Sequence, residues 1–327
     1  MVQTTAEIDY YLKTFLAPLR EWLERPDLTD IWVNRPGEVW VESLGGEIER
    51  YDREAIDEGL LRHLARQIAA FGAQGISREH PLLAATLPDG SRVQIAAPPA
   101  APAGHAIAIR RHVVSNLTLD DWSAGGAFEE LTGGTAVIET ERKFRRVPTS
   151  DAQATLAKAV RERRNILISG GTSTGKTTLL NALLKEIPHE ERLILIEDTE
   201  ELKSANPNTL GLIAARGELA EARVSTEDLL IAALRMRPDR IILGEIRGAE
   251  AFTFLRAINT GHPGSIATIH ANSPARAIEQ LAMLVLQSGS RLDGAELRRY
   301  VRESVGVFVQ LERYEGRRRV SQLLVSE

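Results

Sequence analysis

The sequence predicts a chain of two folded parts: a smaller α+β domain over residues 1–112 and an α/β domain over residues 151–327, joined by a linker over residues 113–150. The 327 residues exceed the length of a typical single domain. The first third mixes hairpin patterns with helical patterns, whereas the second half alternates short apolar runs with helical patterns. Fully apolar strands between helices are typical of a parallel sheet covered by helices on both faces.

Composition excludes several classes of protein. With 43% hydrophobic and 26% charged residues, the chain has ordinary globular usage and can bury a core without cross-links. It contains no cysteine, which excludes disulfides and cysteine-ligated metals. The net charge of -5 gives no general electrostatic reason to expect nucleic-acid binding. No window holds the ~18–20 consecutive apolar residues of a membrane span, and the N-terminus lacks signal-peptide features, so we expect a soluble, cytoplasmic protein.

The first domain is predicted from helical spacing and from turn sequences between apolar stretches. Apolar residues at helical spacing indicate helices over residues 8–23 and 56–71. Pro26 ends the first pattern, and the second stops near Gly72. Strands separated by turns rich in Pro, Gly and Asn are expected at residues 30–33, 38–41, 48–51, 82–87, 92–96 and 106–110.

Residues 113–150 lack sustained periodicity and are rich in Gly, Thr, Ser and charge, which predicts a linker with short elements of its own. The overlapping stretch 141–164 holds eight Lys or Arg and three Asp or Glu. Such a stretch is usually a solvated linker and helix face. Contact with a neighbouring subunit, a membrane surface or a nucleotide stays open as the alternative.

The second domain contains short apolar runs that predict buried parallel strands. They lie at residues 166–168, 193–196, 240–243 and 265–269. In sheets of this kind, ligands bind beyond the carboxyl ends of the strands. We therefore expect the functional residues directly after these four runs.

A phosphate-binding loop follows the first run. It has the full G-x-x-x-x-G-K-[ST] pattern, with a strand before it and a helix after it. Its backbone N–H groups can surround a β-phosphate, Lys176 can reach the β- and γ-phosphates, and the Thr177 hydroxyl can ligate Mg²⁺. The helix start adds its positive dipole end, so ATP and Mg²⁺ are the expected ligands. The expected binding residues are Gly170, Gly171, Thr172, Ser173, Thr174, Gly175, Lys176, Thr177 and Thr178.

Two acidic residues follow the next two runs. Glu197 begins an acidic cluster that would usually be a solvated loop, but beside a phosphate loop it can orient Mg²⁺ or the attacking water. Glu245 stands one residue beyond its strand, after Gly244, in an arrangement typical of a Walker B segment. It can polarise water for attack on the γ-phosphate or hold Mg²⁺ through water. Both are predicted catalytic residues and, with Thr177, metal ligands.

Basic side chains complete the predicted site. Arg247 either binds a phosphate or pairs with Glu245. His270, after the fourth run, can sense the γ-phosphate by donating a hydrogen bond. A cation from another domain or subunit often assists phosphoryl transfer. The candidates are Arg92, Arg110 and Arg111, and strand alternation lets at most one of the last two face the nucleotide.

Four motifs in this order and spacing resemble those of the secretion-superfamily traffic ATPases, whose nucleotide domain is RecA-like. They are the phosphate loop, an Asp box at 196–200, a Walker B segment within 237–247, and a His box that ends at His270. Within that superfamily the chain is most similar to the VirB-eleven or TrbB type of type IV secretion and conjugation. The stretches typical of that branch are 235–240, 29–37 and 87–95.

The resemblance covers nearly the whole chain. It implies a homohexameric motor of two stacked rings, with ATP and Mg²⁺ bound between the two domains of each protomer. It also implies docking on the cytoplasmic face of the bacterial inner membrane, against secretion-channel components and coupling ATPases. First-domain arginines contact the phosphates in that family, which favours Arg92 and Arg110. Long linkers resemble members whose N-terminal domain swaps onto a neighbouring protomer, so a swapped ring stays open.

Three alternatives remain. A pilus or type II secretion motor usually has a different lead-in to its Walker B segment, and many carry a tetracysteine element that this chain lacks. A nucleotide-switched assembly scaffold with little turnover would need the same binding residues. A nucleic-acid motor is disfavoured by the acidic net charge and by the lack of an aromatic-basic strip. The transported substrate, protein or DNA, is not indicated.

Overall fold

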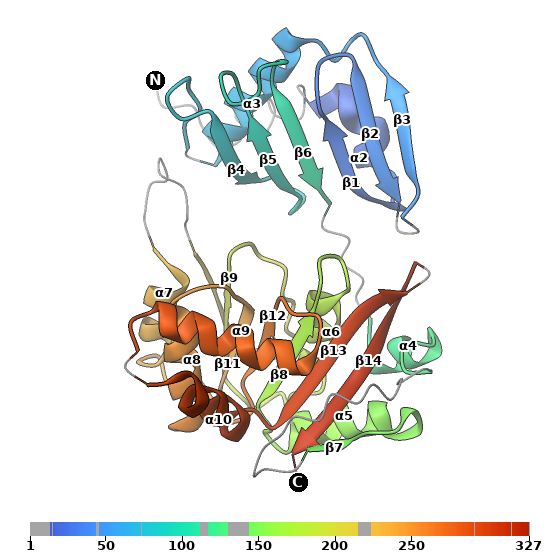
Figure 1. The fold of residues 1–327 in the computed structure, drawn as a ribbon. Helices are drawn as coiled ribbons and strands as arrows, with labels where there is room; N and C mark the ends of the chain where they lie inside the picture. Colours follow the sequence, from blue (N-terminus) through green and yellow to red (C-terminus); the bar gives the residue numbers. More distant parts are fainter. Residues whose placement is uncertain are drawn as a thin grey trace. The chain divides into compact units, whose positions relative to one another are not determined.

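A computed structural model describes residues 14, 16–43, 46–72, 74–111, 117–129, 144–214, 224–290, 292–314 and 316–326. The chain forms two compact units, Met1–Val114 with Ala215–Val224, and Ser115–Ala214 with Ser225–Glu327. Each unit is built around one sheet (Figure 1). Within the described ranges, no helix is long and apolar enough to cross a membrane.

The first unit holds a six-stranded antiparallel sheet in the order β3-β2-β1-β6-β5-β4. Its strands are β1 (Leu28–Val33), β2 (Glu38–Ser43), β3 (Ile48–Asp52), β4 (Leu82–Thr86), β5 (Arg92–Ala96) and β6 (Ala106–Arg110). These are the six strands that the turn sequences predict, with small shifts at their ends. The α+β prediction for this part of the chain is confirmed.

Helix α3 (Glu58–Phe71) packs on this sheet as its spacing predicts. The Asp57 side chain caps it by accepting a hydrogen bond from the Leu60 N–H, and the helix ends at Gly72. Residues three and four apart, such as Leu61, Leu64 and Ile68, are buried in the core of the unit. In the described part of the predicted first helix, Thr14 and Leu16 are α-helical as predicted, residues Ala17–Leu19 tighten into a 3₁₀ turn, η1, and Arg20–Leu23 form the single turn α2. Pro18, which lacks a backbone N–H, stands at the start of η1.

The second unit holds an eight-stranded sheet in the order β10-β9-β11-β12-β8-β13-β14-β7. From β10 to β13 every neighbouring pair is parallel, whereas β14 and β7 are antiparallel to their neighbours. The strands are β7 (Phe144–Arg146), β8 (Ile166–Gly170), β9 (Leu193–Glu197), β10 (Thr209–Ile213), β11 (Arg240–Ile246), β12 (Ile266–Ile269), β13 (Val307–Tyr314) and β14 (Arg317–Ser326). The predicted α/β class with a largely parallel sheet is confirmed.

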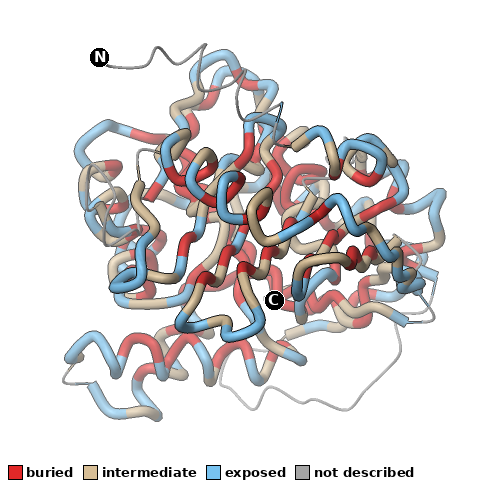
Figure 2. Tube along the Cα trace, turned by 90° about the horizontal axis from the view of Figure 1, so that it is seen from above, coloured by how far each residue is buried: buried red, intermediate tan, exposed pale blue. Residues whose placement is uncertain are grey.

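Helices cover both faces of this sheet, because alternate residues of each strand point to opposite sides. Ile166 and Ile168 of β8 lie in one core cluster with α4, α5 and α6, whereas Leu167 lies in another with α7, α8, α9 and α10. Buried stretches run through the strands and the inner helix faces, as the red segments of Figure 2 show. The helices are α4 (Leu119–Ala124), α5 (Ala152–Arg161), α6 (Lys176–Leu184), α7 (Thr226–Ala233), α8 (Glu250–Asn259), α9 (Pro274–Gln287) and α10 (Gly294–Ser304), with a 3₁₀ turn η2 (Thr149–Asp151) before α5.

The described part of the predicted linker packs within the second unit. Helix α4 starts with a capping box, in which the Thr118 hydroxyl accepts from the Asp121 N–H and the Asp121 carboxylate accepts from the Thr118 N–H. Trp122 and Phe128 are buried in the same core as α5 and α6, and β7 pairs with β14. Six helical residues are too few to show the spacing that predicts a helix. Residues 113–116 and 130–143 of the predicted linker lie outside the described residues.

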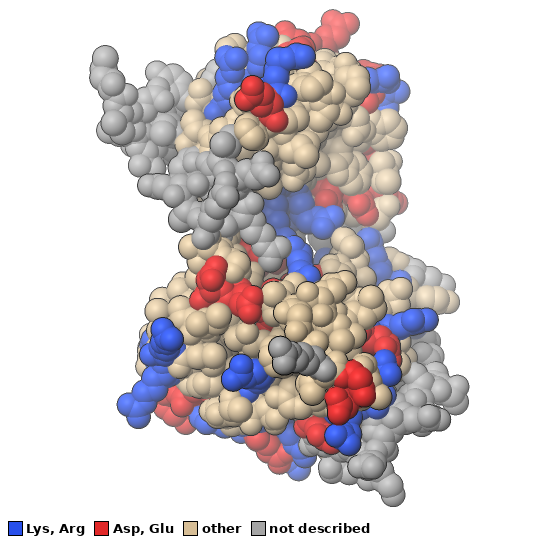
Figure 3. Space-filling model, turned by 60° about the vertical axis from the view of Figure 1, so that its left-hand side comes forward, with Lys and Arg blue, Asp and Glu red and all other residues tan. Residues whose placement is uncertain are grey.

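The described part of the basic stretch 141–164 is balanced by acidic neighbours in its own unit. Arg161 pairs with Glu186 at 2.6 Å, and Arg163 pairs with Glu191 at 3.2 Å. The Arg161–Glu186 pair lies near the surface and contributes little stability, whereas Glu191 is buried, and both pairs leave little uncompensated charge. On the face drawn in Figure 3, described basic and acidic side chains are interspersed on the second unit rather than gathered in a single strip. The arrangement agrees with the interpretation of this stretch as a solvated helix face.

Candidate active site

The phosphate loop, residues 170–177, joins β8 to α6 at the carboxyl edge of the second sheet. Gly175 has φ of 94°, a left-handed conformation that glycine adopts without strain. Gly170 has no room for a side chain, because a Cβ there would lie 2.5 Å from Thr174 Oγ1 and 2.9 Å from the Leu311 carbonyl oxygen. The Thr174 hydroxyl donates to the Gly171 carbonyl at 2.9 Å and so closes the loop on itself. The loop therefore has the compact backbone that its glycines predict.

Lys176 opens helix α6 and folds back over the loop. Its Nζ donates to the carbonyl oxygens of Gly170, at 3.0 Å, and Gly171, at 2.9 Å. Burial lowers the pKa of Lys176, and the negative charge of Glu245 acts in the opposite direction. The ammonium is thus held at the loop with neutral oxygens as its hydrogen-bond acceptors.

Glu245 stands near the end of β11 between two basic side chains. Its Oε1 lies 2.8 Å from Nε2 of His270, which follows β12 directly. Its Oε2 accepts a hydrogen bond from Arg247, whose Nη1 also reaches Asp198 Oδ2 at 3.0 Å. Arg247 therefore pairs with Glu245, which was one of its two predicted roles, and joins the ends of β9 and β11.

The pKa of His270 is lowered by burial and by the nearby positive charges of Lys176 and Arg247, against the opposing effect of Glu245. The ring is therefore predominantly neutral near pH 7, with one nitrogen able to donate and the other able to accept. Its side chain remains about half exposed, at 48%. A neutral, accessible imidazole at this position can donate a hydrogen bond to a ligand on the loop.

Glu197 ends β9 and is buried, with 5% of its surface exposed. Its Oε2 accepts from the backbone N–H groups of Glu201 and Leu202, both at 2.9 Å. Burial outweighs these bonds and raises the pKa of Glu197 to about 7. Gly244 makes the close packing possible, because a Cβ there would lie 3.3 Å from Glu197 Cγ. Strand β11 extends to Ile246, so the prediction that Glu245 stands one residue beyond its strand was wrong, and Gly244 within the strand leaves room for Glu197.

The predicted first-domain arginines lie on the sheet of the first unit. Arg92 of β5 is opposite Arg110 of β6, and Arg110 is opposite Asp30 of β1. Directly opposed residues share a face, so Arg92 and Arg110 point to the same side. Arg110 Nε pairs with Asp30 Oδ1 at 3.0 Å. Arg111 donates instead to the Arg25 carbonyl, as alternation along a strand predicts.

A cation that the motifs do not reveal also lies at the phosphate loop. Arg318, near the start of β14, places Nη1 3.5 Å from Thr178 Oγ1 in the first turn of α6. Its Cδ lies 2.9 Å from the point that a Cβ at Gly175 would occupy. The only sequence signal is the run of three arginines at 317–319, and the pairing of β14 with β13 decides which of them reaches the loop.

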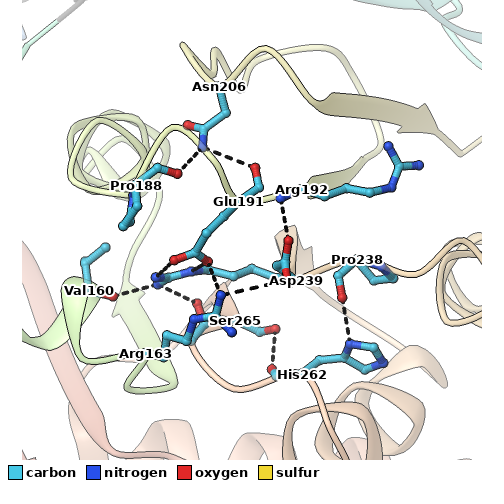
Figure 4. A network of polar contacts seen from close by, with 12 residues as sticks. Val160, Arg163, Pro188, Glu191, Arg192, Asn206, Pro238, Asp239, His262 and Ser265 are labelled. Carbon is cyan, nitrogen blue, oxygen red and sulfur yellow. Dashed lines mark hydrogen bonds and ion pairs between the residues drawn. The ribbon is translucent and has the colours of Figure 1, made fainter.

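The stretch before Walker B builds a structural network at the opposite, amino edge of the sheet (Figure 4). Arg240, with no exposed surface, donates to both carboxylate oxygens of Glu191, at 2.6 and 2.8 Å, and to the Val160 carbonyl at 2.7 Å. Nearby, the Arg192 N–H donates to Asp239 at 2.7 Å, and His262 Nδ1 lies 3.1 Å from the Pro238 carbonyl oxygen. These residues hold the strand ends together away from the phosphate loop.

Relatives of known family match almost the entire chain. A profile of the family described as type II/IV secretion system protein matches residues 14–313. The chain is 36% identical over 326 residues to the type IV secretion system protein VirB11 of Bartonella quintana, covering 95% of this chain and 91% of that protein. It is 39% identical over 332 residues to the type IV secretion system protein PtlH of Bordetella pertussis, covering 96% and 94% respectively.

Solved structures share the fold at lower identity. The Legionella pneumophila ATPase DotB has a TM-score of 0.61 and 19% identity, covering 95% of this chain and 80% of that one. The pilus retraction motor PilT with bound ADP has a TM-score of 0.58 and 18% identity, covering 97% and 83%. The fold is therefore shared with these proteins, while the closer sequence matches decide the family. The chain belongs to the type II/IV secretion system protein family, among relatives of the VirB11 type from type IV secretion systems.

Proposed function

We propose that the chain is an ATPase of a type IV secretion system that binds ATP with Mg²⁺ on the phosphate loop and hydrolyses it at the carboxyl edge of the second sheet. One arrangement carries the proposal. Lys176, Glu245 and His270 come from the ends of three different strands and meet at the loop, where their charges affect one another. A base, a cation and a hydrogen-bond donor beside a phosphate cradle are the components that phosphoryl transfer requires.

Binding follows from the loop and the helix behind it. The N–H groups at the start of α6 and the positive end of its dipole attract a phosphate. The Lys176 ammonium, now donating to two neutral carbonyls, would gain charged phosphate oxygens as acceptors. These residues supply the affinity for the β- and γ-phosphates of a nucleoside triphosphate, and Thr172 to Thr178 line the same loop and helix start.

The residues present fit a magnesium ion that is shared with the phosphates. The described residues contain no group of three or more His, Cys, Asp or Glu arranged for a metal. Mg²⁺ at nucleotide sites needs only one or two protein oxygens beside phosphates and water. Thr177 would supply one such oxygen, and Glu245 and Glu197 would reach the ion through water, since Oε2 of Glu245 already accepts from Arg247 and Oε2 of Glu197 accepts two backbone bonds. When bound, the ion neutralises charge on the β- and γ-phosphates.

Hydrolysis would proceed by attack of water on the γ-phosphorus. Glu245 takes the proton of that water as a new bond forms to phosphorus and the bond to the β-phosphate oxygen breaks, leaving ADP and phosphate. Arg247 holds one oxygen of Glu245 and so aims the other. His270 and Lys176 donate hydrogen bonds to the γ-phosphate oxygens, on which negative charge develops in the transition state.

The family membership of the chain suggests its assembly and its place in the cell. We propose that six copies form a ring motor on the cytoplasmic face of the bacterial inner membrane, in contact with secretion-channel components and coupling ATPases. Arg92 and Arg110, on one face of the first-unit sheet, would complete the site at the phosphates. Nucleotide turnover would then move secretion components.

The proposal is tested by measuring the ATPase rate against protein concentration, alongside sedimentation with and without Mg·ATP. A rate per protomer that rises as a hexamer-sized species forms supports a site completed by assembly. Hydrolysis that is independent of assembly would contradict the ring, and hexamers that bind ATP without hydrolysing it would indicate a nucleotide-switched scaffold instead.

A further inference from the structure

The hairpin of β13 and β14 brings an arginine to the phosphate loop on the side away from Glu245 and His270. In the sheet, β8 lies between β12 and β13, so the strands that carry the two catalytic candidates and the strands of the hairpin flank the loop on opposite sides. Arg313 is opposite Arg318 in the pairing of β13 with β14. A nucleotide on the loop would therefore meet the hairpin at a different part of its phosphate chain from the part that faces Glu245 and His270.

Arg318 packs directly on the loop and on the first turn of α6. Its Cδ and Nε would lie 2.9 and 3.6 Å from a Cβ at Gly175, and Trp122 Cη2 would lie 3.4 Å from the same point. Its Nη1 is 3.5 Å from Thr178 Oγ1, at the limit of a hydrogen bond. The glycine therefore leaves room for the stem of Arg318, and Thr178 meets its guanidinium.

The guanidinium has no negative partner within the described part of the chain. No carboxylate there lies within ion-pair distance of Arg318, although its neighbour Arg319 pairs with Glu312 at 2.6 Å. Burial lowers the pKa of Arg318, and the positive charge of Arg313 acts in the same direction. Partly buried charges are normally paired, because an unpaired charge loses hydration without compensation.

We propose that Arg318 is a nucleotide-binding residue, whose missing negative partner is the phosphate chain of the nucleotide at its nucleoside-proximal end. Lys176 reaches toward the β- and γ-phosphates, on the side of β11 and β12. Thr178 and Arg318 lie along the other side of the loop, where the α-phosphate of a nucleoside di- or triphosphate would lie. This inference rests on the proposed nucleotide binding and adds to it a residue that the phosphate-loop motif does not contain.

The experiment compares Arg318→Gln with the matched control Arg317→Gln, which removes the exposed neighbouring arginine of the same strand. Mg·ADP affinity is measured by isothermal titration on the full chain, and the unfolding temperature is measured without nucleotide. We expect Arg318→Gln to bind Mg·ADP ~10-fold more weakly or worse, because a charge-assisted hydrogen bond is lost. The Arg317→Gln affinity should match the wild type.

A second readout separates binding from a structural role. Without nucleotide, Arg318→Gln should unfold at the wild-type temperature or above it, because an uncompensated charge is removed. In steady state its KM for ATP should rise by a larger factor than its kcat falls, and Arg318→Lys should lose less affinity than the glutamine variant. Wild-type ADP affinity in Arg318→Gln would overturn the inference while leaving the proposed function intact. A wild-type protein that binds no Mg·ADP would overturn both.

Discussion

Nε2 of His270 lies 2.8 Å from Oε1 of Glu245, although Glu245 lies near the end of β11 and His270 directly follows β12. The contact is possible because β11 and β12 are parallel neighbours whose carboxyl ends meet at one edge of the sheet. Arg247 occupies the other oxygen of Glu245 and links it to Asp198 beyond β9. One oxygen of the carboxylate is therefore held by Arg247, while the other lies beside His270 without a hydrogen bond from the described residues, at the edge where the phosphate loop begins.

His270 should distinguish ATP from ADP. The His270→Ala variant is expected to bind Mg·ADP with wild-type affinity but to bind a non-hydrolysable Mg·ATP analogue ~3- to 10-fold more weakly, because the lost donor faces only a γ-phosphate. Titration calorimetry measures both constants. His262→Ala is the control, since that imidazole contacts the Pro238 carbonyl at the opposite edge. An equal loss of affinity for Mg·ADP and for the Mg·ATP analogue would show that His270 does not sense the γ-phosphate.

Glu197 should make stability fall as pH rises through neutrality. Its pKa is about 4.5 in an unfolded chain and about 7 in the folded one, so the folded state binds more protons between these values. The contribution of this group to stability is then fully present below about pH 4.5 and is lost as the pH rises toward about 7, by on the order of 2–3 kcal/mol. Glu197→Gln cannot titrate and should flatten the decline.

Urea unfolding at pH 5, 6, 7 and 8 measures this difference between wild type and Glu197→Gln. The control is Glu200→Gln, whose exposed carboxylate pairs with Lys203 at 3.0 Å and should leave the slope unchanged. Parallel curves for wild type and Glu197→Gln would mean that the Glu197 carboxyl titrates normally.

Arg240 should contribute to the free energy of unfolding through its buried ion pair with Glu191. Arg240→Met leaves the buried Glu191 without its bidentate partner and should lower the free energy of unfolding by about 3–5 kcal/mol. The double variant Arg240→Met with Glu191→Leu should recover much of that loss, because no buried charge is left unpaired and Arg163, which loses Glu191, is partly exposed and lies 3.8 Å from Asp239. Urea unfolding of the three proteins gives the comparison, with Arg161→Gln as an exposed control expected to cost less than about 1 kcal/mol. A double variant as unstable as the single one would contradict the role given to the ion pair.

Much of the fold could be predicted because the sequence carries strong local signals. The apolar runs at 166–168 and 193–196 form buried parallel strands, and the phosphate loop has its motif and flanking elements in one continuous stretch. Residues at the carboxyl ends of parallel strands gather at one edge, which is why the sequence predicts Glu245 and His270 near the loop.

The remaining features depend on contacts that no local pattern records. Arg318 reaches the loop only through the register of β14 with β13, and α4 is too short to show periodicity. The stretch 235–240 is typical of the family, yet its Arg240 pairs with Glu191 at the amino edge of the sheet and does not contact the phosphate loop. Whether Arg92 and Arg110 reach a nucleotide depends on the arrangement of the two units and stays a prediction.

The assignment of Glu245 is tested most directly by the turnover of Glu245→Gln at saturating Mg·ATP, with ATP affinity measured on the same preparation. The amide keeps the size of the side chain but cannot take a proton from water. We expect ATP affinity within about threefold of wild type and turnover lower by ~100-fold or more, as for loss of a general base. Glu200→Gln, on the exposed loop after Glu197, should hydrolyse ATP at the wild-type rate. Normal turnover by Glu245→Gln would contradict the account of this site.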